Sequence, residues 1–578
     1  MSSPDASGPR TAPPTANPAT APTATDPATG AHGIPGTATD PSASQGKRRW
    51  IGLGVLAAAL SMIVLDGTIV GVALPRIITD LSLNLTDAQW VNSLYSMIFA
   101  ALLLSFGRLG DRYGRRTMLL VGVTLFVVGS ITAAMATGAS SLIASRALQG
   151  VGGAMVLPAT LSTVNATFRG KDRAVAFGIW GAVMAGVAAI GPLLGGWLTT
   201  SFDWRWIFWV NVPLGVAVVV GALLTVNDTK GRPGGPGVDV DGLLTSAIGL
   251  GLLVFGLIEA NSLGWWTPKA DFTLFGWTWS TSAPLSPAPV AIAVGVFFLF
   301  LFWIWEKHRA GNGRSALLDI RLLDIPTFTW GNLTAAMVAA GEFALVFVLP
   351  LYLVNAQGLS IMGAGLVLAA MALGAFFSGA QARHLAARFT PTRVVVLGLT
   401  LELIGVVATA LVLGPDRSPW FVAIAMTVYG VGLGLASAQL TSTVLRDVPP
   451  EQSGSASATQ STFRQVGSAI GSAIAGTALA AGLTAVLTDR LSAIKGLPSQ
   501  AVDKLASATI DSAGGSIDGL RAAGTHGQLG NLGPTVTQVL ERAFADGTRV
   551  AVFVAAAFLV LGLIGSLRVD RLARQSAS

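Results

Sequence analysis

The stretch GRLGDRYGRRTML at residues 107–119 joins two long apolar runs of the chain. Glycine has no Cβ atom, so its glycines allow helices to approach closely and the chain to turn tightly. Its aspartate can cap the N-terminus of the following helix or pair with an arginine. Its basic side chains hold the turn in water at one face of an apolar layer. These expectations concern Gly107, Gly110, Asp111, Arg112, Gly114, Arg115 and Arg116.

Outward from this turn, long apolar stretches alternate with short polar ones. The 578 residues are 52% hydrophobic and only 11% charged, and the mean hydropathy is +0.65, a balance typical of membrane proteins. A helix of about 17 to 25 apolar residues spans a bilayer. Fourteen such spans are predicted, at 51–74, 90–107, 117–137, 141–164, 174–199, 206–226, 242–259, 288–305, 331–354, 360–386, 393–414, 419–444, 455–487 and 549–567.

The basic residues collect in alternate loops between these spans, and a further cluster, Lys47 to Arg49, precedes the first span. Cytoplasmic loops carry the excess of Lys and Arg, so the pattern predicts a multi-pass protein of the cell membrane with both termini in the cytoplasm. This placement also explains the net charge of +7. No basic stripe with interleaved aromatic residues occurs, so a nucleic acid partner is not expected.

Linkers divide the predicted spans into three groups. The Gly/Pro segment TKGRPGGPG at 229–237 and a basic segment at 306–321 bracket the seventh and eighth spans. A faint echo of the 107–119 turn at 379–398 indicates an internal duplication. The expected organisation is a disordered tail at 1–47, a six-helix bundle at 48–228, two inserted helices at 237–306, and a second six-helix bundle at 322–570 that includes an outer polar loop, a surface cap, at 488–548.

Several classes of chemistry are excluded or disfavoured by the residues present. The chain has no cysteine, which rules out disulfides and thiolate metal sites. Its four histidines fall in tails or loops, so any proton carrier within the membrane is expected to be a carboxylate. No phosphate-binding loop for a nucleotide-driven pump occurs. No cofactor and no metal ion are expected.

Four ionisable residues well inside predicted spans are candidates for function, because charge there is costly unless it is paired, hydrogen-bonded or neutralised. Asp66 lies in the first span and Arg146 in the fourth, at depths that differ by only ~5 Å at ~1.5 Å per residue. They can therefore meet, either as a proton-coupling pair or as a fixed structural pair. Glu342 and Glu402 lie mid-span and suit either proton or cation binding or a structural hydrogen bond. Two other acids, Glu259 and Glu306, lie near span ends and are expected at the membrane interface.

The 107–119 turn resembles the signature loop of the major facilitator superfamily. LDGTIVGVALP at 65–75, SRALQGVGGA at 145–154 and GAVMAGVAAIGPLLGGWL at 181–198 are similar to motifs of its fourteen-helix drug/proton antiporter branch, as are DWRWIFWVNVPLG at 203–215 and FRQVGSAIGSAI at 463–474. The resemblance implies an all-α fold of two six-helix bundles plus two inserted helices. It also implies that Asp66, influenced by Arg146, takes part in proton coupling. On the fifth span it implies a gating seam built from Gly181, Gly186, Gly191, Pro192, Gly195 and Gly196.

The function expected from these features is proton-coupled export of small lipophilic or cationic drugs and antibiotics by alternating access, by a chain that works as a monomer and is not an enzyme. The partners are the substrate, protons and the lipid bilayer. An exporter or symporter of an endogenous metabolite is the alternative within transporters. An integral membrane enzyme or a channel is the alternative outside them, but the acids are scattered over different helices and no selectivity-filter sequence occurs.

Overall fold

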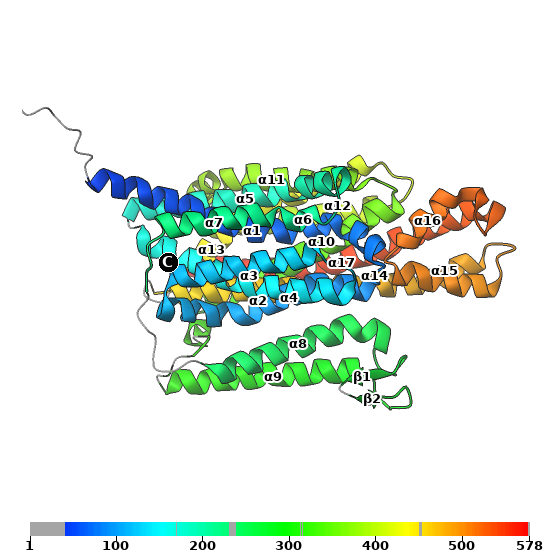
Figure 1. The fold of residues 1–578 in the computed structure, drawn as a ribbon, viewed down its shortest axis with the longest axis horizontal. Helices are drawn as coiled ribbons and strands as arrows, with labels where there is room; N and C mark the ends of the chain where they lie inside the picture. Colours follow the sequence, from blue (N-terminus) through cyan, green and yellow to red (C-terminus); the bar gives the residue numbers. More distant parts are fainter. Residues whose placement is uncertain are drawn as a thin grey trace, which may run out of the picture. The chain divides into compact units, whose positions relative to one another are not determined.

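The fold is given by a computed structural model, which describes residues 41–168, 170–230, 239–274, 276–312, 314, 316–318, 320–449 and 453–575. Residues from Arg48 onward form one compact unit. It is built almost entirely from helices (Figure 1). Those before the middle of the chain are α1 (Pro41–Leu81), α2 (Leu85–Tyr113), α3 (Arg115–Ala134), α4 (Ala139–Thr167), α5 (Gly170–Ser201), α6 (Trp206–Trp209), α7 (Asn211–Thr225), α8 (Val240–Leu263) and α9 (Pro287–Gly311).

The remaining elements follow a short connection after α9. They are η1 (Ile320–Asp324), α10 (Pro326–Leu351) with a π-helical turn η2 (Tyr352–Ala356), α11 (Ile361–Phe389), α12 (Pro391–Val412), α13 (Pro419–Val444), α14 (Ser453–Ser492), α15 (Ser499–Asp511), α16 (Gly515–Ala523), the 3₁₀ turns η4 (Gly524–His526) and η5 (Gly530–Leu532), and α17 (Gly533–Gln575). The end of the helices at which α2 meets α3 is called the basic end below, because Arg112, Arg115 and Arg116 lie there.

Thirteen helices in the described residues are long and apolar enough to cross a membrane. The fourteenth predicted span, 174–199, lies in α5, a helix of 32 residues many of whose side chains fall outside the described set. The predicted helical membrane class is therefore confirmed. One small sheet departs from it: β1 (Phe272–Leu274) and β2 (Trp277–Trp279) form an antiparallel hairpin between α8 and α9.

Polar residues at the start of several helices satisfy backbone N–H groups that have no partner within the helix. Asn84 Oδ1 accepts a hydrogen bond from Asp87 N at 2.7 Å, and Asp87 Oδ2 accepts one from Asn84 N at 3.1 Å, which begins α2 with a reciprocal cap. Ser360 caps α11 by accepting from Gly363 N at 3.1 Å. These residues set where each apolar run becomes a helix.

Small residues bring the helices of the second half of the chain into close contact. A Cβ atom added at Gly430 of α13 would lie 1.9 Å from the Met371 carbonyl oxygen of α11. A Cβ atom at Gly405 of α12 would lie 2.4 Å from Tyr429 N of α13. Such backbone approach is the usual packing of helices in lipid, where association depends on van der Waals contact and hydrogen bonds.

The inserted helices α8 and α9 pack against each other as a pair (Figure 1). Gly256 of α8 lies against Ala288 and Ile292 of α9. On its other side α8 contacts α2 and α14, where the indole of Trp90 donates to Glu259 Oε1 at 2.9 Å. The pair is therefore attached to helices from both halves of the chain.

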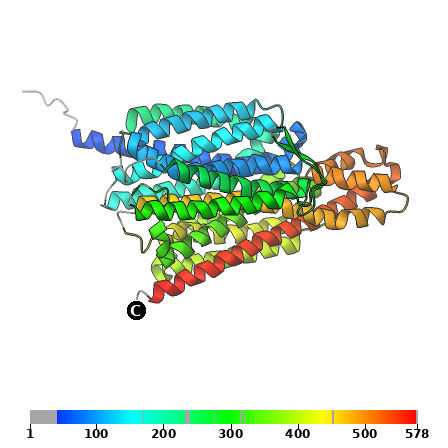
Figure 2. The ribbon, with the colours of Figure 1, turned by 90° about the horizontal axis from the view of Figure 1, so that it is seen from below.

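The structure adds detail to two predicted segments. Helix α1 begins at Pro41, within the tail predicted at 1–47, while residues 1–40 and most of the 229–237 linker lie outside the described residues. The segment 488–548, expected to be a polar surface cap, is largely helical. It contains α15 and α16, which lie beyond the end of the long helices opposite the basic end in both views (Figures 1 and 2). Amphipathic helices form there because Val502 and Ile517 can be buried while polar residues stay exposed.

Candidate functional site

The deepest charges in the first half of the chain form an ion pair between α1 and α4. Arg146 Nη1 donates to Asp66 Oδ2, and both side chains are almost completely buried, with 1% and 0% of their surface exposed. Removing two charges from water costs several kcal/mol per ion unless other hydrogen bonds satisfy them. The surroundings of this pair therefore decide whether it is stable.

Polar side chains from neighbouring helices supply those hydrogen bonds. Asp66 Oδ1 accepts from Gln149 Nε2 at 2.9 Å and from Asn211 Nδ2 at 3.3 Å. The same two amides also donate to Ser130 Oγ of α3, at 2.8 and 3.2 Å. The carboxylate of α1 is thus bound directly by α4 and α7, and the same two amides connect it to α3.

The guanidinium group of Arg146 is equally well satisfied. It donates to Gln149 Oε1 at 2.8 Å and to the Val91 carbonyl at 3.3 Å. Its Cζ atom lies 4.2 Å from the centroid of the Tyr95 ring of α2, a cation–π contact. Arg146 therefore has partners other than Asp66.

A second group of ionisable residues lies in the other half of the chain. Glu402 of α12 is fully buried, and neither of its carboxyl oxygens has a hydrogen-bond partner among the described residues. Glu342 of α10, which is half-buried, and Arg464 of α14 are close enough to interact with it electrostatically. The hydroxyl of the buried Tyr429 of α13 also has no described partner. The two mid-span glutamates therefore share one polar environment with one arginine.

The 107–119 turn is fixed by residues from a distant part of the chain. Gly114 has φ of +117°, and an added Cβ atom would lie 2.4 Å from Asp228 Oδ2. Asp228 Oδ1 accepts from Arg116 N at 3.2 Å, so this residue caps the start of α3. Arg115 Nη1 donates to the Ser162 carbonyl of α4 at 3.1 Å. The side chain of Asp111, the expected cap, lies outside the described residues.

The other residues of the 107–119 turn are less constrained by their surroundings. Arg112 is exposed and lies against Tyr113, with its Cζ 5.7 Å from the ring centroid. A Cβ atom at Gly107 or Gly110 would meet Pro158 or Met118 at 3.4 Å, which is close to ordinary contact. Among the three expected glycines, only Gly114 is required by the local geometry.

Replacing Gly114 with alanine is expected to destabilise the basic end. The backbone conformation at this position is strained for any residue with a Cβ atom and costs about 1–3 kcal/mol, and the methyl group would displace Asp228 from its cap. We expect a lower melting temperature and reduced transport, measured by thermal unfolding in detergent and by export assays. Gly110→Ala is the control and should be close to neutral; equal effects of the two substitutions would contradict this account.

Helix α5 carries the glycine-rich seam. Gly191 and Gly195 lie against α1, where added Cβ atoms would be 2.0 Å from Thr68 Oγ1 and 2.9 Å from Ile69 Cγ1. Gly196 faces Met362 of α11, and the carbonyl of Pro192 approaches Gly365 of the same helix. The seam therefore joins helices from both halves of the chain. The two remaining predicted members, Gly181 and Gly186, lie within α5, but their surroundings fall outside the described residues.

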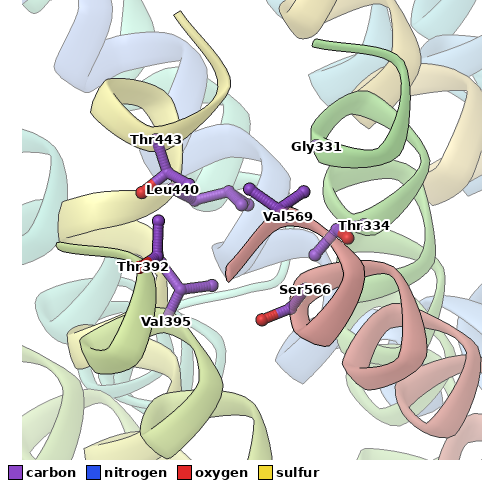
Figure 3. Close-up of a pocket in the computed structure, with 8 residues that line it drawn as sticks. All are labelled: Gly331, Thr334, Thr392, Val395, Leu440, Thr443, Ser566 and Val569. Carbon is purple, nitrogen blue, oxygen red and sulfur yellow. The ribbon is translucent and has the colours of Figure 1, made fainter. Parts of the chain in front are cut away.

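A small cavity lies at the basic end of the second half of the chain (Figure 3). Its lining residues come from α10, α12, α13 and α17 and are Gly331, Thr334, Thr392, Val395, Leu440, Thr443, Ser566 and Val569. Its volume of about 10 Å³ is comparable to the space of about one water molecule. A drug-sized compound does not fit, so this cavity is not the substrate site.

Sequence reasoning missed several of these residues, although some carried a signal. Gln149 lies three positions after Arg146 and so on the same helix face. Asn211 is a polar residue at the start of an apolar helix. Asp228 carries no such signal, because its contact with Arg116 spans 112 residues of sequence.

A chain of long apolar helices from two halves, with charges buried between them, has the construction of a multi-pass membrane transporter. The chain belongs to the Major Facilitator Superfamily, whose family profile matches residues 56–282 and 242–472. This is a family of transporters, not of enzymes.

Comparison with known proteins gives related drug exporters and a shared fold. The chain is 31% identical over 446 residues to the probable actinorhodin transporter of Streptomyces coelicolor, covering 75% of this chain and 73% of that protein. It is 32% identical over 464 residues to the puromycin resistance protein of Streptomyces alboniger, covering 79% and 87%. A crystal structure of a bacterial homolog of the human lysosomal transporter Spinster, inward-facing and unoccupied, aligns with a TM-score of 0.58 at 19% identity, covering 91% of this chain and 97% of the other. The resemblance to drug-exporting members of the superfamily is thereby confirmed.

Proposed function

We propose that this protein is a proton-coupled antiporter that exports small lipophilic or cationic drugs or antibiotics by alternating access. The observation that carries the proposal is the buried pair of Asp66 and Arg146. The Asp66 carboxylate, on α1, is bound by side chains of α4 and α7, and the Gln149 and Asn211 amides that bind it also hold Ser130 of α3. A change in its protonation therefore changes contacts on all four helices.

The proposed cycle uses two states of Asp66. In the ionised state the carboxylate pairs with Arg146 and accepts from Gln149 and Asn211. Protonation removes its charge and its attraction for Arg146, which keeps its contacts to Gln149 and Val91. The four helices are then free to repack, and release of the proton on the other side restores the pair.

Glu342 and Glu402 are proposed as a second proton-coupling site, in the other half of the chain. Burial of Glu402 without a described hydrogen-bond donor favours its neutral form, and Arg464 provides a nearby positive charge. An acid in each half would let proton binding influence both moving parts of the transporter.

The moving parts are proposed to be the bundles 48–228 and 322–570, which rock around a central site with the helices of 237–306 attached. Both termini lie in the cytoplasm, and the chain works as a monomer. The glycine seam of α5 seals the path between the halves and so favours exchange over leak. Each proton that moves inward contributes ~2.3 kcal/mol per 100 mV of membrane potential, in addition to the pH gradient.

The substrate class is supported by the relatives, whose names refer to actinorhodin transport and puromycin resistance. The alternative is an exporter or symporter of an endogenous metabolite. Proteoliposomes that hold the purified protein and an imposed pH gradient separate these functions, with dyes, lipophilic cations and antibiotics as candidate substrates. We expect accumulation of such compounds against their gradient in the compartment that loses protons. Accumulation in the compartment that gains protons would indicate symport.

A further inference from the structure

The basic ends of the two inserted helices hold a pair of carboxyl groups outside the proposed coupling sites. Asp239 precedes α8 and Glu306 lies in the last turns of α9, with 2% and 0% of their surface exposed. Glu306 was expected at the membrane interface, and the structure shows that its side chain is buried by protein. Each acid has one oxygen that is well satisfied: Asp239 Oδ1 accepts from Gly242 N and from the Trp305 indole, both at 2.9 Å, and Glu306 Oε2 accepts from Leu318 N at 2.9 Å.

The other oxygens of the two acids converge on one point. A Cβ atom added at Gly242 would lie 2.5 Å from Glu306 Oε1 and 2.8 Å from Asp239 Oδ2. Neither of these oxygens has a hydrogen-bond partner among the described residues. Two buried carboxylates whose remaining oxygens face the same space repel each other when both are ionised, and a single shared proton reduces that repulsion.

We propose that Asp239 and Glu306 form a proton-binding site, in which protonated Glu306 Oε1 donates to Asp239 Oδ2. The other charged groups facing the pair are Arg309 of α9, whose Nε lies 3.3 Å from Asp239 Oδ2, and Arg108 of α2. In the described part of the connecting segment, Leu318 N contacts Glu306, and its described neighbours Ala316 and Leu317 carry no charge.

The partners of Asp239 identify it as the ionised member of the pair. Burial raises the pKa of its carboxyl group, but hydrogen bonds from Trp305, Glu306 and Gly242, together with the charge of Arg309, outweigh burial and lower the pKa. Glu306 has no comparable set of donors and therefore holds the proton. A second cation in place of the proton is disfavoured because Arg309 already lies beside Asp239.

Protonation of Glu306 affects the segment that leads into the second half of the chain. Glu306 Oε2 holds Leu318 N, which lies two residues before η1, and Arg321 of η1 donates to the Ala310 carbonyl of α9 at 2.8 Å. The shared proton thus keeps the segment between α9 and α10 in place. Loss of the proton, as pH rises, places two negative charges together and favours release of this segment.

The absence of cysteine from the chain makes the site testable by single-cysteine labelling. Leu317→Cys places a thiol in the segment at a position that is 5% exposed, and Asn312→Cys provides an exposed thiol as reference. The ratio of their labelling rates by a soluble maleimide cancels the ordinary effect of pH on thiols. We expect the labelling ratio of Leu317→Cys to Asn312→Cys to rise by roughly tenfold between mildly acidic and mildly alkaline buffer. Such a rise corresponds to an interaction of about one pKa unit between the two acids.

Two substitutions that supply a permanent hydrogen-bond donor should remove this response. Glu306→Gln donates to Asp239 at every pH, and Asp239→Asn donates to Glu306 while retaining a residue that caps helices well. Both should keep the ratio low and constant, whereas Glu259→Gln on the same helix pair should leave the rise unchanged. A ratio independent of pH in the protein with Glu306, or an undiminished rise in both variants, would overturn the proposal. Labelling requires no transport, so the result does not depend on the proposed function.

Discussion

Asp66→Asn is expected to abolish proton-driven export while the protein still folds. The amide cannot ionise, so the pair with Arg146 no longer forms and breaks during transport. Removing one partner of a buried ion pair costs about 3–5 kcal/mol. We expect a smaller loss here, because Arg146 keeps Gln149 Oε1 and the Val91 carbonyl as acceptors. Export is measured in proteoliposomes with an imposed pH gradient, and folding is measured by thermal unfolding and gel filtration.

Asp503→Asn is a matched control, because it makes the same chemical change at an exposed position in α15. It should leave export unchanged. If Asp66→Asn folds normally and still accumulates substrate against its gradient, the pair has only a structural role and the proposed coupling is wrong.

Glu402→Gln is expected to have the next largest effect, because glutamine mimics a glutamic acid that never releases its proton. Proton flux that accompanies export should fall roughly tenfold or more, because the amide cannot bind and release a proton; tenfold corresponds to about 1.4 kcal/mol in the barrier. The measurement is a pH-sensitive dye inside proteoliposomes, read together with substrate flux. Glu342→Gln should have a similar effect if the two acids act as one site with Arg464.

The control for this second site is Glu259→Gln, since that residue lies in an apolar helix but bonds only to the Trp90 indole in the described part of the chain. A glutamine oxygen can accept the same bond. Proton flux in Glu402→Gln that is as high as in this control would rule out a coupling role for Glu402.

Much of the fold follows from local properties of the sequence. The length of each apolar run predicts a helix long enough to span a membrane. Asp66 and Arg146 were expected to meet because opposite charges at similar depth in an apolar layer are stabilised by pairing. The structure adds the polar residues that stabilise the buried pair, which are Gln149, Asn211 and Ser130. These could not be predicted, because depth alone does not determine which helices are neighbours.

The parts that were not predicted depend on contacts between distant segments. The cap of α3 comes from Asp228, and the shared-proton site joins Asp239 to Glu306 across the inserted pair. Composition predicted a polar surface cap at 488–548, and the packing of its helices on α14 and α17 comes from the structure. The position of Glu306 near the end of a span predicted a site at the interface. Its burial depends on contacts with Gly242 and Leu318, which the sequence does not reveal.

Antiport itself is tested most directly by letting a substrate gradient drive protons. Proteoliposomes are loaded with a transported compound, placed in substrate-free buffer at equal pH, and followed with a lumenal pH dye. With the protein inserted so that the loaded side corresponds to the cytoplasm, the account predicts that the lumen acidifies as substrate leaves, and that Asp66→Asn shows no such change. A lumen that becomes alkaline, or stays at constant pH while substrate leaves, would contradict proton-coupled export.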